Sequence, residues 1–451
     1  MYKSAPRVVI AGTGSGCGKT TTVCAILQAL KDRGLSPMSF KCGPDYIDPM
    51  FHTSILGLDS ENLDIFFAGE EGVRRSFIRH AGDVNVVEGV MGMYDGISMS
   101  SDRSSSYHLA RTIDAPVVLV VNVRGMALSA AAVVKGYMTL RSPNVVRGVI
   151  FNKVSPMTYP SLKKVVEDEC GIPVFGYMPD TPESSLESRH LGLVTAAEVE
   201  TLQHKMQLLG QAAEKCVDLD GLLALMRAQS PMECPDEDVK PLGKVRLAVA
   251  RDKAFCFYYR DNFELFEALG AQIVPFSPIS DEKLPDCDGL YMGGGYPELY
   301  LEKLSANESM RASVREAVTG GMPTVAECGA FMYLCRSIDG FPMAGVFPTD
   351  CTGTGRLTRF GYATLHTQGE SMLFAPGDTM QGHEFHYWDA GDPGSALRAV
   401  KPNGRETRCA YVSDTLYAGY PHLYFPSCKS AAERFIKKCL ERRRCNEADG
   451  N

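Results

Sequence analysis

The hydrophobic residues in the first half of the chain form short, continuous runs separated by longer stretches with helical spacing. A run such as Val8–Ala11 is short and apolar throughout, which indicates a strand buried on both faces. The other runs of this kind are Val84–Glu88, Val117–Val121 and Gly148–Asn152, and the clearest helices are expected at Lys19–Asp32 and Tyr159–Cys170. This alternation predicts a parallel sheet covered by helices on both faces.

The alternation stops at residues 230–244, a stretch with three prolines and mixed charge, and then begins again. The second series comprises strands at Val245–Ala250, Gly270–Pro275 and Gly289–Met292, with a helix at Asp261–Leu269. We therefore predict two α/β domains, residues 1–229 and 245–451, joined by a linker at 230–244.

Composition narrows the functional classes. The 451 residues have a net charge of −8 and show no basic stripe, so we expect no nucleic-acid partner. We expect no membrane partner, because no run approaches the ~20 apolar residues of a span. The N-terminal residues lead directly into a strand, and the fifteen cysteines contain no CxxC pair. We therefore expect free thiols in a cytoplasmic protein.

A glycine-rich segment, Gly12–Thr20, lies between the first predicted strand and the first predicted helix. Backbone N–H groups and a helix N-terminus in this context favour phosphate binding. Lys19 would reach the outer phosphates of ATP, and the Thr20 hydroxyl would coordinate Mg²⁺. The spacing departs from the usual pattern, because Thr13 stands where a glycine is expected. The residues expected to contact the nucleotide are Gly14, Ser15, Gly16, Cys17, Gly18, Lys19, Thr20 and Thr21.

Acidic residues follow further predicted strands. Glu88 ends a buried strand, and ligands of open parallel sheets bind at the carboxyl ends of strands. We expect Glu88, and Asp95 in the loop that follows, to bind Mg²⁺. Asp45, in another loop after a strand, is expected to bind the metal or act in phosphoryl transfer. A simpler interpretation is that Asp45 and Asp48 only cap turns.

The second domain contains a cysteine at a predicted elbow. A short strand in Pro323–Ala330 runs into a turn with Cys328 at its apex, and a helix is expected at Phe331–Arg336. Such a turn exposes a nucleophile, and the helix N-terminus favours the thiolate. A nucleophilic cysteine needs a base, and His422 is the expected one.

A glycine cluster follows the predicted strand Gly289–Met292. The backbone N–H groups of Gly294 and Gly295 are suited to stabilising an oxyanion. A plain tight turn is the alternative interpretation of this cluster.

These motifs resemble those of a known family. The phosphate loop is similar to that of dethiobiotin synthetase, and KCGPDYIDP, VVEGVMGMYDG and ESRHLGLV resemble the cobyrinic acid a,c-diamide synthase family. In the second half, AVARDKAFCFYYRDN, PFSPISD and LYMGGGYPEL resemble the class I glutamine amidotransferase domain of that family. The resemblance covers roughly residues 5–430. It implies an α/β fold with an N-terminal phosphate-loop domain like dethiobiotin synthetase and a C-terminal flavodoxin-like amidotransferase domain.

The resemblance also implies a reaction. ATP and Mg²⁺ would activate a carboxylate of an acidic tetrapyrrole-derived macrocycle as a carboxyl phosphate. L-Glutamine would supply ammonia through a thioester at Cys328, with His422 as base. Asn152 would contact the adenine, and a homodimer is an assembly to consider. Class I domains usually carry a glutamate two residues after the histidine, where this chain has Tyr424. The third member of the triad is therefore left open.

A histidine-containing segment, Gly382–Tyr387 (GHEFHY), also resembles one in this family. His383 and His386 are three residues apart instead of the four typical of metalloproteases, so a metal pair is not favoured. A structural or substrate-lining role is the better interpretation.

Cobyrinic acid, amidated at acetates a and c, is the expected substrate. Nickel-sirohydrochlorin and hydrogenobyrinic acid are alternatives that the motifs do not separate. Cobyric acid synthases share the domain plan, but KCGPDYIDP and ARDKAFCFYY favour the a,c-diamide enzymes. A partner-switching ATPase, such as a chromosome-partitioning ATPase, would explain the first half but would leave Cys328 and His422 without a role.

Overall fold

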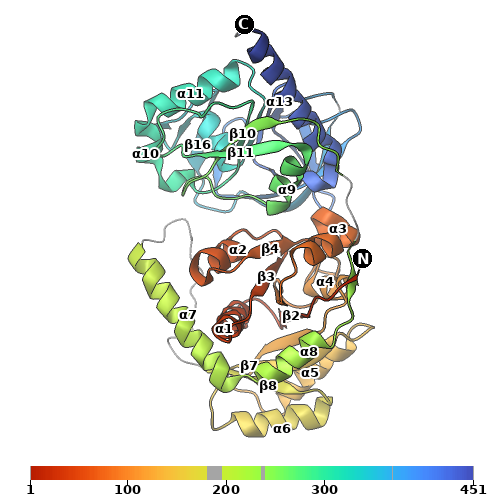
Figure 1. Ribbon diagram of the computed structural model, residues 1–451. Helices are drawn as coiled ribbons and strands as arrows, with labels where there is room; N and C mark the ends of the chain where they lie inside the picture. The colour runs from red at the N-terminus through yellow and green to blue at the C-terminus, as the bar shows by residue number, and fades with distance from the viewer. Residues whose placement is uncertain (1, 180–195, 235–238, 368, 450–451) are drawn as a thin grey trace. The chain divides into compact units, whose positions relative to one another are not determined.

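A computed structural model describes residues 2–179, 196–234, 239–367 and 369–449 of the chain (Figure 1). The chain divides into two compact units, Met1–Asp236 and Glu237–Asn451. The motif Glu187–Val194 lies outside the described residues. Among the helices that the structure describes, none has both the length and the apolar character of a membrane span.

The main sheet of the first unit has seven strands in the order β4-β3-β5-β2-β6-β7-β8, and every neighbouring pair is parallel. Its strands are β2 (Arg7–Gly12), β3 (Pro37–Cys42), β4 (Ser60–Leu63), β5 (Val84–Glu88), β6 (Val117–Asn122), β7 (Val146–Val154) and β8 (Val174–Pro179). The helices are α1 (Lys19–Asp32), α2 (Ile47–Phe51), α3 (Ile65–His80), α4 (Ser106–Thr112), α5 (Ser129–Thr139), α6 (Tyr159–Cys170), α7 (Ala196–Cys216) and α8 (Leu219–Arg227), with a π-helical turn at His52–Leu56. The predicted parallel sheet is confirmed.

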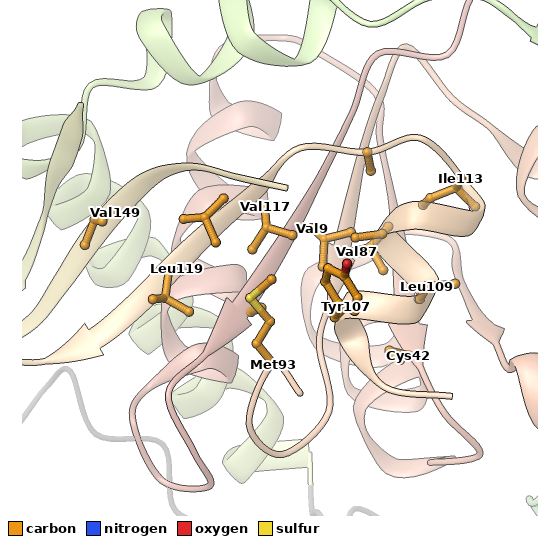
Figure 2. Close-up of a cluster of buried hydrophobic side chains, with 14 of the residues drawn as sticks. Val9, Cys42, Val87, Met93, Tyr107, Leu109, Ile113, Val117, Leu119 and Val149 are labelled. Carbon is orange, nitrogen blue, oxygen red and sulfur yellow. The ribbon is translucent and has the colours of Figure 1, made fainter. Parts of the chain in front are cut away.

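Successive residues of β2 enter two different cores because side chains alternate between the faces of a strand. Val9 packs with Val87 and Val117 and with Tyr107 and Leu109 of α4 (Figure 2). The core on this face also includes residues of α3, α5 and α6. The opposite face packs against α1, α7 and α8. Helices therefore cover both faces, which explains why these strands are apolar throughout.

Two short strands, β1 (Tyr2–Lys3) and β9 (Met232–Glu233), pair in antiparallel fashion within the first unit. Part of segment 230–244 therefore belongs to this unit as a strand.

The second unit contains a six-stranded sheet in the order β11-β10-β12-β13-β23-β22, parallel except for β22. Its strands are β10 (Val245–Ala250), β11 (Ala271–Phe276), β12 (Gly289–Met292), β13 (Thr324–Glu327), β22 (Tyr411–Val412) and β23 (Leu416–Gly419). Its helices are α9 (Arg260–Leu269), α10 (Leu301–Ala306), α11 (Glu308–Thr319), α12 (Gly329–Leu334) and α13 (Lys429–Asp449), with 3-10 turns at Pro297–Leu299 and Phe425–Cys428.

Two smaller sheets complete this unit, in the orders β21-β20-β17-β18-β24 and β15-β14-β16-β19. Their strands are β14 (Cys335–Ile338), β15 (Phe341–Pro342), β16 (Phe347–Gly353), β17 (Arg359–Thr367), β18 (Thr379–His386), β19 (Trp388–Ala390), β20 (Leu397–Val400), β21 (Glu406–Cys409) and β24 (His422–Leu423). The prediction of a helix at Phe331–Arg336 was wrong at its C-terminal end. The helix ends at Leu334, and Cys335 is extended and begins β14.

Candidate functional site

The glycine-rich loop between β2 and α1 has the backbone of a phosphate cradle. Gly16 and Gly18 have φ angles of 72° and 100°, which favour glycine. Lys19 folds back over the loop, and its Nζ donates to the Gly14 carbonyl at 2.9 Å. Burial lowers the pKa of Lys19, because its ammonium group is removed from water. A bound phosphate would supply the negative charge that stabilises this ammonium. The loop and its lysine can therefore bind an anion.

Asn152, at the carboxyl end of β7, is engaged by the loop. Its Nδ2 donates to the Cys17 carbonyl at 2.8 Å, and its Oδ1 accepts from the Lys153 N–H at 3.0 Å. A Cβ atom on Gly18 would overlap the Asn152 amide. In this structure Asn152 holds the phosphate loop, and its expected contact with adenine stays a prediction.

A buried ionic cluster adjoins the loop. Glu88 ends β5, and its Oε1 accepts from Thr20 Oγ1 at 2.5 Å and from Lys41 Nζ at 3.0 Å. Lys41 Nζ also lies 2.5 Å from Asp48 Oδ2. Burial raises the pKa of Glu88 to about 6, although the neighbouring lysine opposes the shift. Parallel strands bring these groups together because the carboxyl ends of β2, β3 and β5 share one edge of the sheet.

The oxygen atoms of this cluster fit a hard divalent cation. The Thr20 hydroxyl and the Glu88 carboxylate are in contact, and both are ligands that Mg²⁺ accepts. Glu88 Oε2 is buried without a hydrogen-bond partner among the described residues; His52 Nε2 is 3.8 Å away. A cation would satisfy this oxygen.

The other two predicted ligands cap turns. Asp45 Oδ1 accepts from the Ile47 N–H at 2.8 Å, and Asp95 Oδ2 accepts from the Gly92 N–H at 2.7 Å. Burial and the Asp48 carboxylate raise the pKa of Asp45 to about 6. The roles of Asp45 and Asp95 in metal binding or catalysis stay predictions.

Sequence reasoning assigned no role to Lys41 or His52, which complete this cluster. Lys41 is buried in β3, and its neighbours Glu88 and Asp48 raise its pKa against the effect of burial. The sequence did contain a signal for this cluster. Lys41 lies within a strand next to a phosphate loop, and a buried ammonium requires an acidic partner.

Cys328 forms the predicted elbow. It follows β13 with φ 49° and ψ −105°, a backbone conformation that is unusual for a non-glycine residue. Its N–H donates to the Gly419 carbonyl at 2.8 Å. Burial and the Glu298 carboxylate raise the pKa of Cys328, whereas the Gly329 N–H lowers it. Burial thus opposes the expected thiolate, and formation of the nucleophile requires a base.

His422 lies beside this cysteine. A Cβ atom built on Gly294 would be 3.2 Å from His422 Nε2 and 3.3 Å from Cys328 Cβ, so both side chains converge on this glycine. Burial lowers the pKa of His422 to about 3, and His383 and His386 add to the effect. The neutral ring can accept a proton from a thiol.

The glycine cluster packs closely around this pair. The Gly294 carbonyl accepts from the N–H groups of Cys256 and Phe257, both at 3.0 Å. Gly295 has a φ of 156°, and a Cβ there would overlap the Ala254 carbonyl. Glycine is thus required at both positions by close approach, and the oxyanion role of their N–H groups stays a prediction.

The histidines of Gly382–Tyr387 are buried in the second unit. His386 stacks on Tyr420 with centroids 3.8 Å apart, and its Nδ1 lies 2.7 Å from the Trp388 carbonyl. Glu384 pairs with Arg359 at 3.4 Å. These contacts give the segment structural functions next to His422.

The fold and these two sites define a class: a nucleotide-binding domain joined to a glutamine amidotransferase domain. Residues 8–194 match the CobQ/CobB/MinD/ParA nucleotide binding domain, and residues 246–429 match the CobB/CobQ-like glutamine amidotransferase domain.

Three relatives cover almost the whole chain, and all three are named cobyrinate a,c-diamide synthase. The protein from Caldanaerobacter subterraneus subsp. tengcongensis is 40% identical over 96% of this chain and 98% of its own. That from Methanothermobacter thermautotrophicus is 39% identical over 96% and 100%. That from Fusobacterium nucleatum is 39% identical over 92% and 97%. This chain belongs to the cobyrinate a,c-diamide synthase family, which confirms the expected family and fold class.

Proposed function

We propose that this chain uses ATP and L-glutamine to convert the a and c acetate carboxylates of cobyrinic acid into amides. One observation carries the proposal: a single chain places a phosphate loop beside buried acids, and a cysteine elbow beside a neutral histidine. The first arrangement suits carboxylate activation, and the second suits glutamine hydrolysis. The names of the full-length relatives supply the substrate.

Glutamine hydrolysis begins with transfer of the Cys328 Sγ proton to His422. The thiolate attacks the amide carbon of glutamine, and the N–H groups of Gly294 and Gly295 stabilise the resulting oxyanion. His422 returns the proton to the departing nitrogen, which leaves as ammonia. Water then hydrolyses the thioester with His422 as base, releasing glutamate and restoring the thiol.

Carboxylate activation takes place at the phosphate loop. Lys19 and the loop N–H groups hold the triphosphate, and a macrocycle carboxylate attacks the γ-phosphorus to give a carboxyl phosphate and ADP. Mg²⁺, held by Thr20 and Glu88, would neutralise charge on the phosphates. Ammonia attacks the activated carbonyl carbon and phosphate leaves. We assign Asp45 as a candidate acceptor of the proton that the nitrogen loses.

All fifteen cysteines are free thiols. We propose a cytoplasmic setting for the reaction, since a reducing compartment keeps such thiols free.

A substrate panel tests the proposal. Purified protein is incubated with ATP, glutamine and one macrocycle: cobyrinic acid, nickel-sirohydrochlorin or hydrogenobyrinic acid. Mass spectrometry should show the diamide from cobyrinic acid. A diamide formed only from one of the other macrocycles would contradict the proposed substrate. Absence of any amide, with ATP and glutamine both consumed, would contradict the reaction.

A further inference from the structure

Class I domains usually have a glutamate two residues after the histidine base. Tyr424 stands there, and its hydroxyl donates to Asp261 Oδ2 at 2.5 Å. A base of this kind is generally oriented by a third group that takes the proton on its other ring nitrogen. For His422 that nitrogen is Nδ1, because Nε2 is the ring nitrogen nearer to Gly294, the glycine that Cys328 also approaches.

Glu327 lies next to this nitrogen. It is the last residue of β13, immediately before Cys328, and its side chain is buried. Its Oε2 is 3.9 Å from His422 Nδ1. Its Oε1 accepts from the Leu423 N–H at 3.3 Å and from the Tyr291 hydroxyl at 3.4 Å. Two hydrogen bonds therefore hold one oxygen of the carboxyl group, and the other oxygen lies toward the base.

The backbone around His422 is also held in place. Asn262 Nδ2 donates to the Leu423 carbonyl at 2.8 Å, and Asn262 Oδ1 accepts from the Phe425 N–H at 2.9 Å. On the other side, β24 pairs with β18, where His422 lies opposite His383. These contacts fix the backbone of His422, so the orientation of its ring depends on the groups around the side chain. A group at Nδ1 would determine that orientation.

We propose that Glu327 is the positioning residue that orients His422 for proton transfer from Cys328. The proposal rests on the glutaminase half of the proposed function. The Glu327 carboxylate would accept the Nδ1–H, which leaves the Nε2 lone pair free for the Sγ–H proton. When the imidazolium forms, the carboxylate is its counter-ion. The separation of 3.9 Å exceeds a hydrogen bond. It must close by about 1 Å, as catalytic contacts commonly do when substrate binds.

Protonation of the pair follows from burial. Burial raises the pKa of Glu327, and burial lowers the pKa of His422. Before glutamine binds, the raised pKa favours a proton on the Glu327 carboxyl group. Glutamine hydrolysis requires the carboxylate form, so glutaminase activity should rise with pH. The other titratable groups that interact electrostatically with this pair or with Cys328 are His383, His386, Tyr258, Tyr291, Tyr417, Tyr420, Glu298 and Glu384.

Glu327→Gln and Glu327→Asp variants of the full-length protein test the proposal. A glutamine side chain at position 327 has the same size as glutamate. Its amide can donate to His422 Nδ1, which favours the His422 tautomer with Nε2 protonated. We expect Glu327→Gln to lower glutaminase kcat by about 100-fold or more, with the KM for glutamine changed less than about threefold. Glu327→Asp should retain more activity than Glu327→Gln. The matched control is Asp288→Asn, a buried acid at the amino end of β12 whose Oδ2 accepts from the Arg246 N–H.

A second measurement separates orientation from folding. Alkylation of Cys328 by iodoacetamide, followed by mass spectrometry across pH, reports thiolate formation without ATP or macrocycle. The wild-type rate should rise at lower pH than the rate in Glu327→Gln, and ammonia-dependent synthesis by the variant should stay within about twofold of wild type.

Two outcomes would overturn the proposal. One is glutaminase activity in Glu327→Gln within about threefold of wild type. The other is equal loss of glutaminase and ammonia-dependent synthesis, which would show a structural role. Failure of the substrate panel with a normal alkylation profile would instead contradict only the proposed synthetase reaction.

Discussion

Gly294 lies between the two residues of the glutaminase site, so Gly294→Ala is a direct test of their arrangement. The added methyl carbon would lie under 3.0 Å from His422 Cε1 and 3.3 Å from Cys328 Cβ. The backbone has little room to retreat, because the Gly294 carbonyl accepts two N–H groups at 3.0 Å. The His422 ring is therefore the part that must move.

The magnitude follows from these distances. Carbon atoms in contact prefer a separation of about 3.5–4.0 Å, so the ring must shift by about 1 Å or turn. A displacement of ~1 Å in a catalytic group costs on the order of 100-fold in rate, which corresponds to about 2.7 kcal/mol in the barrier. The substitution keeps the N–H of residue 294, so the loss would come from the displaced base.

Steady-state glutaminase kinetics measure this effect, with ammonia-dependent synthesis as the internal check on folding. We expect glutaminase kcat/KM to fall by about 100-fold and ammonia-dependent synthesis to stay within about twofold. The matched control is Gly369→Ala, where an added methyl group meets nothing within 4 Å. Glutaminase activity in Gly294→Ala equal to that of the control would refute the placement of His422 beside Cys328.

Two further predictions concern the synthetase site. Ammonia-dependent synthesis, assayed at constant free-ammonia concentration, should fall as the pH drops through about 6. Asp45 and Glu88 have pKa values raised to about 6, so both lose their negative charge below that pH. A rate unchanged down to pH ~5 would contradict the need for these carboxylates. The chain has one phosphate loop and one cysteine elbow, so we expect a monoamide to accumulate and then decay, with one ATP consumed per amide. Liquid chromatography with mass detection would show this, and one ATP per diamide would exclude two separate activations.

Local features of both sites were predictable from the sequence. The apolar run of β5 and the glycine pattern before α1 each depend on neighbouring residues and are described by short-range rules. The elbow at Cys328 was predictable for the same reason, because a strand, a tight turn and a helix follow one another directly.

Contacts between distant segments could not be predicted in this way. Lys41 meets Glu88 only because β3 and β5 are neighbours in the sheet, although they are far apart in the chain. In the sequence Glu327 is only a polar residue that ends a strand. Its approach to His422 depends on the pairing of β13 with β23, which places Glu327 opposite Gly419, three residues before His422. The raised pKa of Cys328 could not be predicted in this way either, because burial of the thiol depends on how the whole unit packs.

We propose that one chain carries two separable sites, one that releases ammonia and one that activates a carboxylate. The direct test compares Cys328→Ala and Lys19→Ala in synthesis driven by glutamine and by ammonium, with cobyrinic acid and ATP present. Cys328→Ala should lose glutamine-dependent synthesis and keep ammonium-dependent synthesis. Lys19→Ala should lose both by about 100-fold, since charge stabilisation of phosphoryl transfer is removed. Failure of ammonium to rescue Cys328→Ala, or near-normal ammonium-dependent synthesis by Lys19→Ala, would contradict the account.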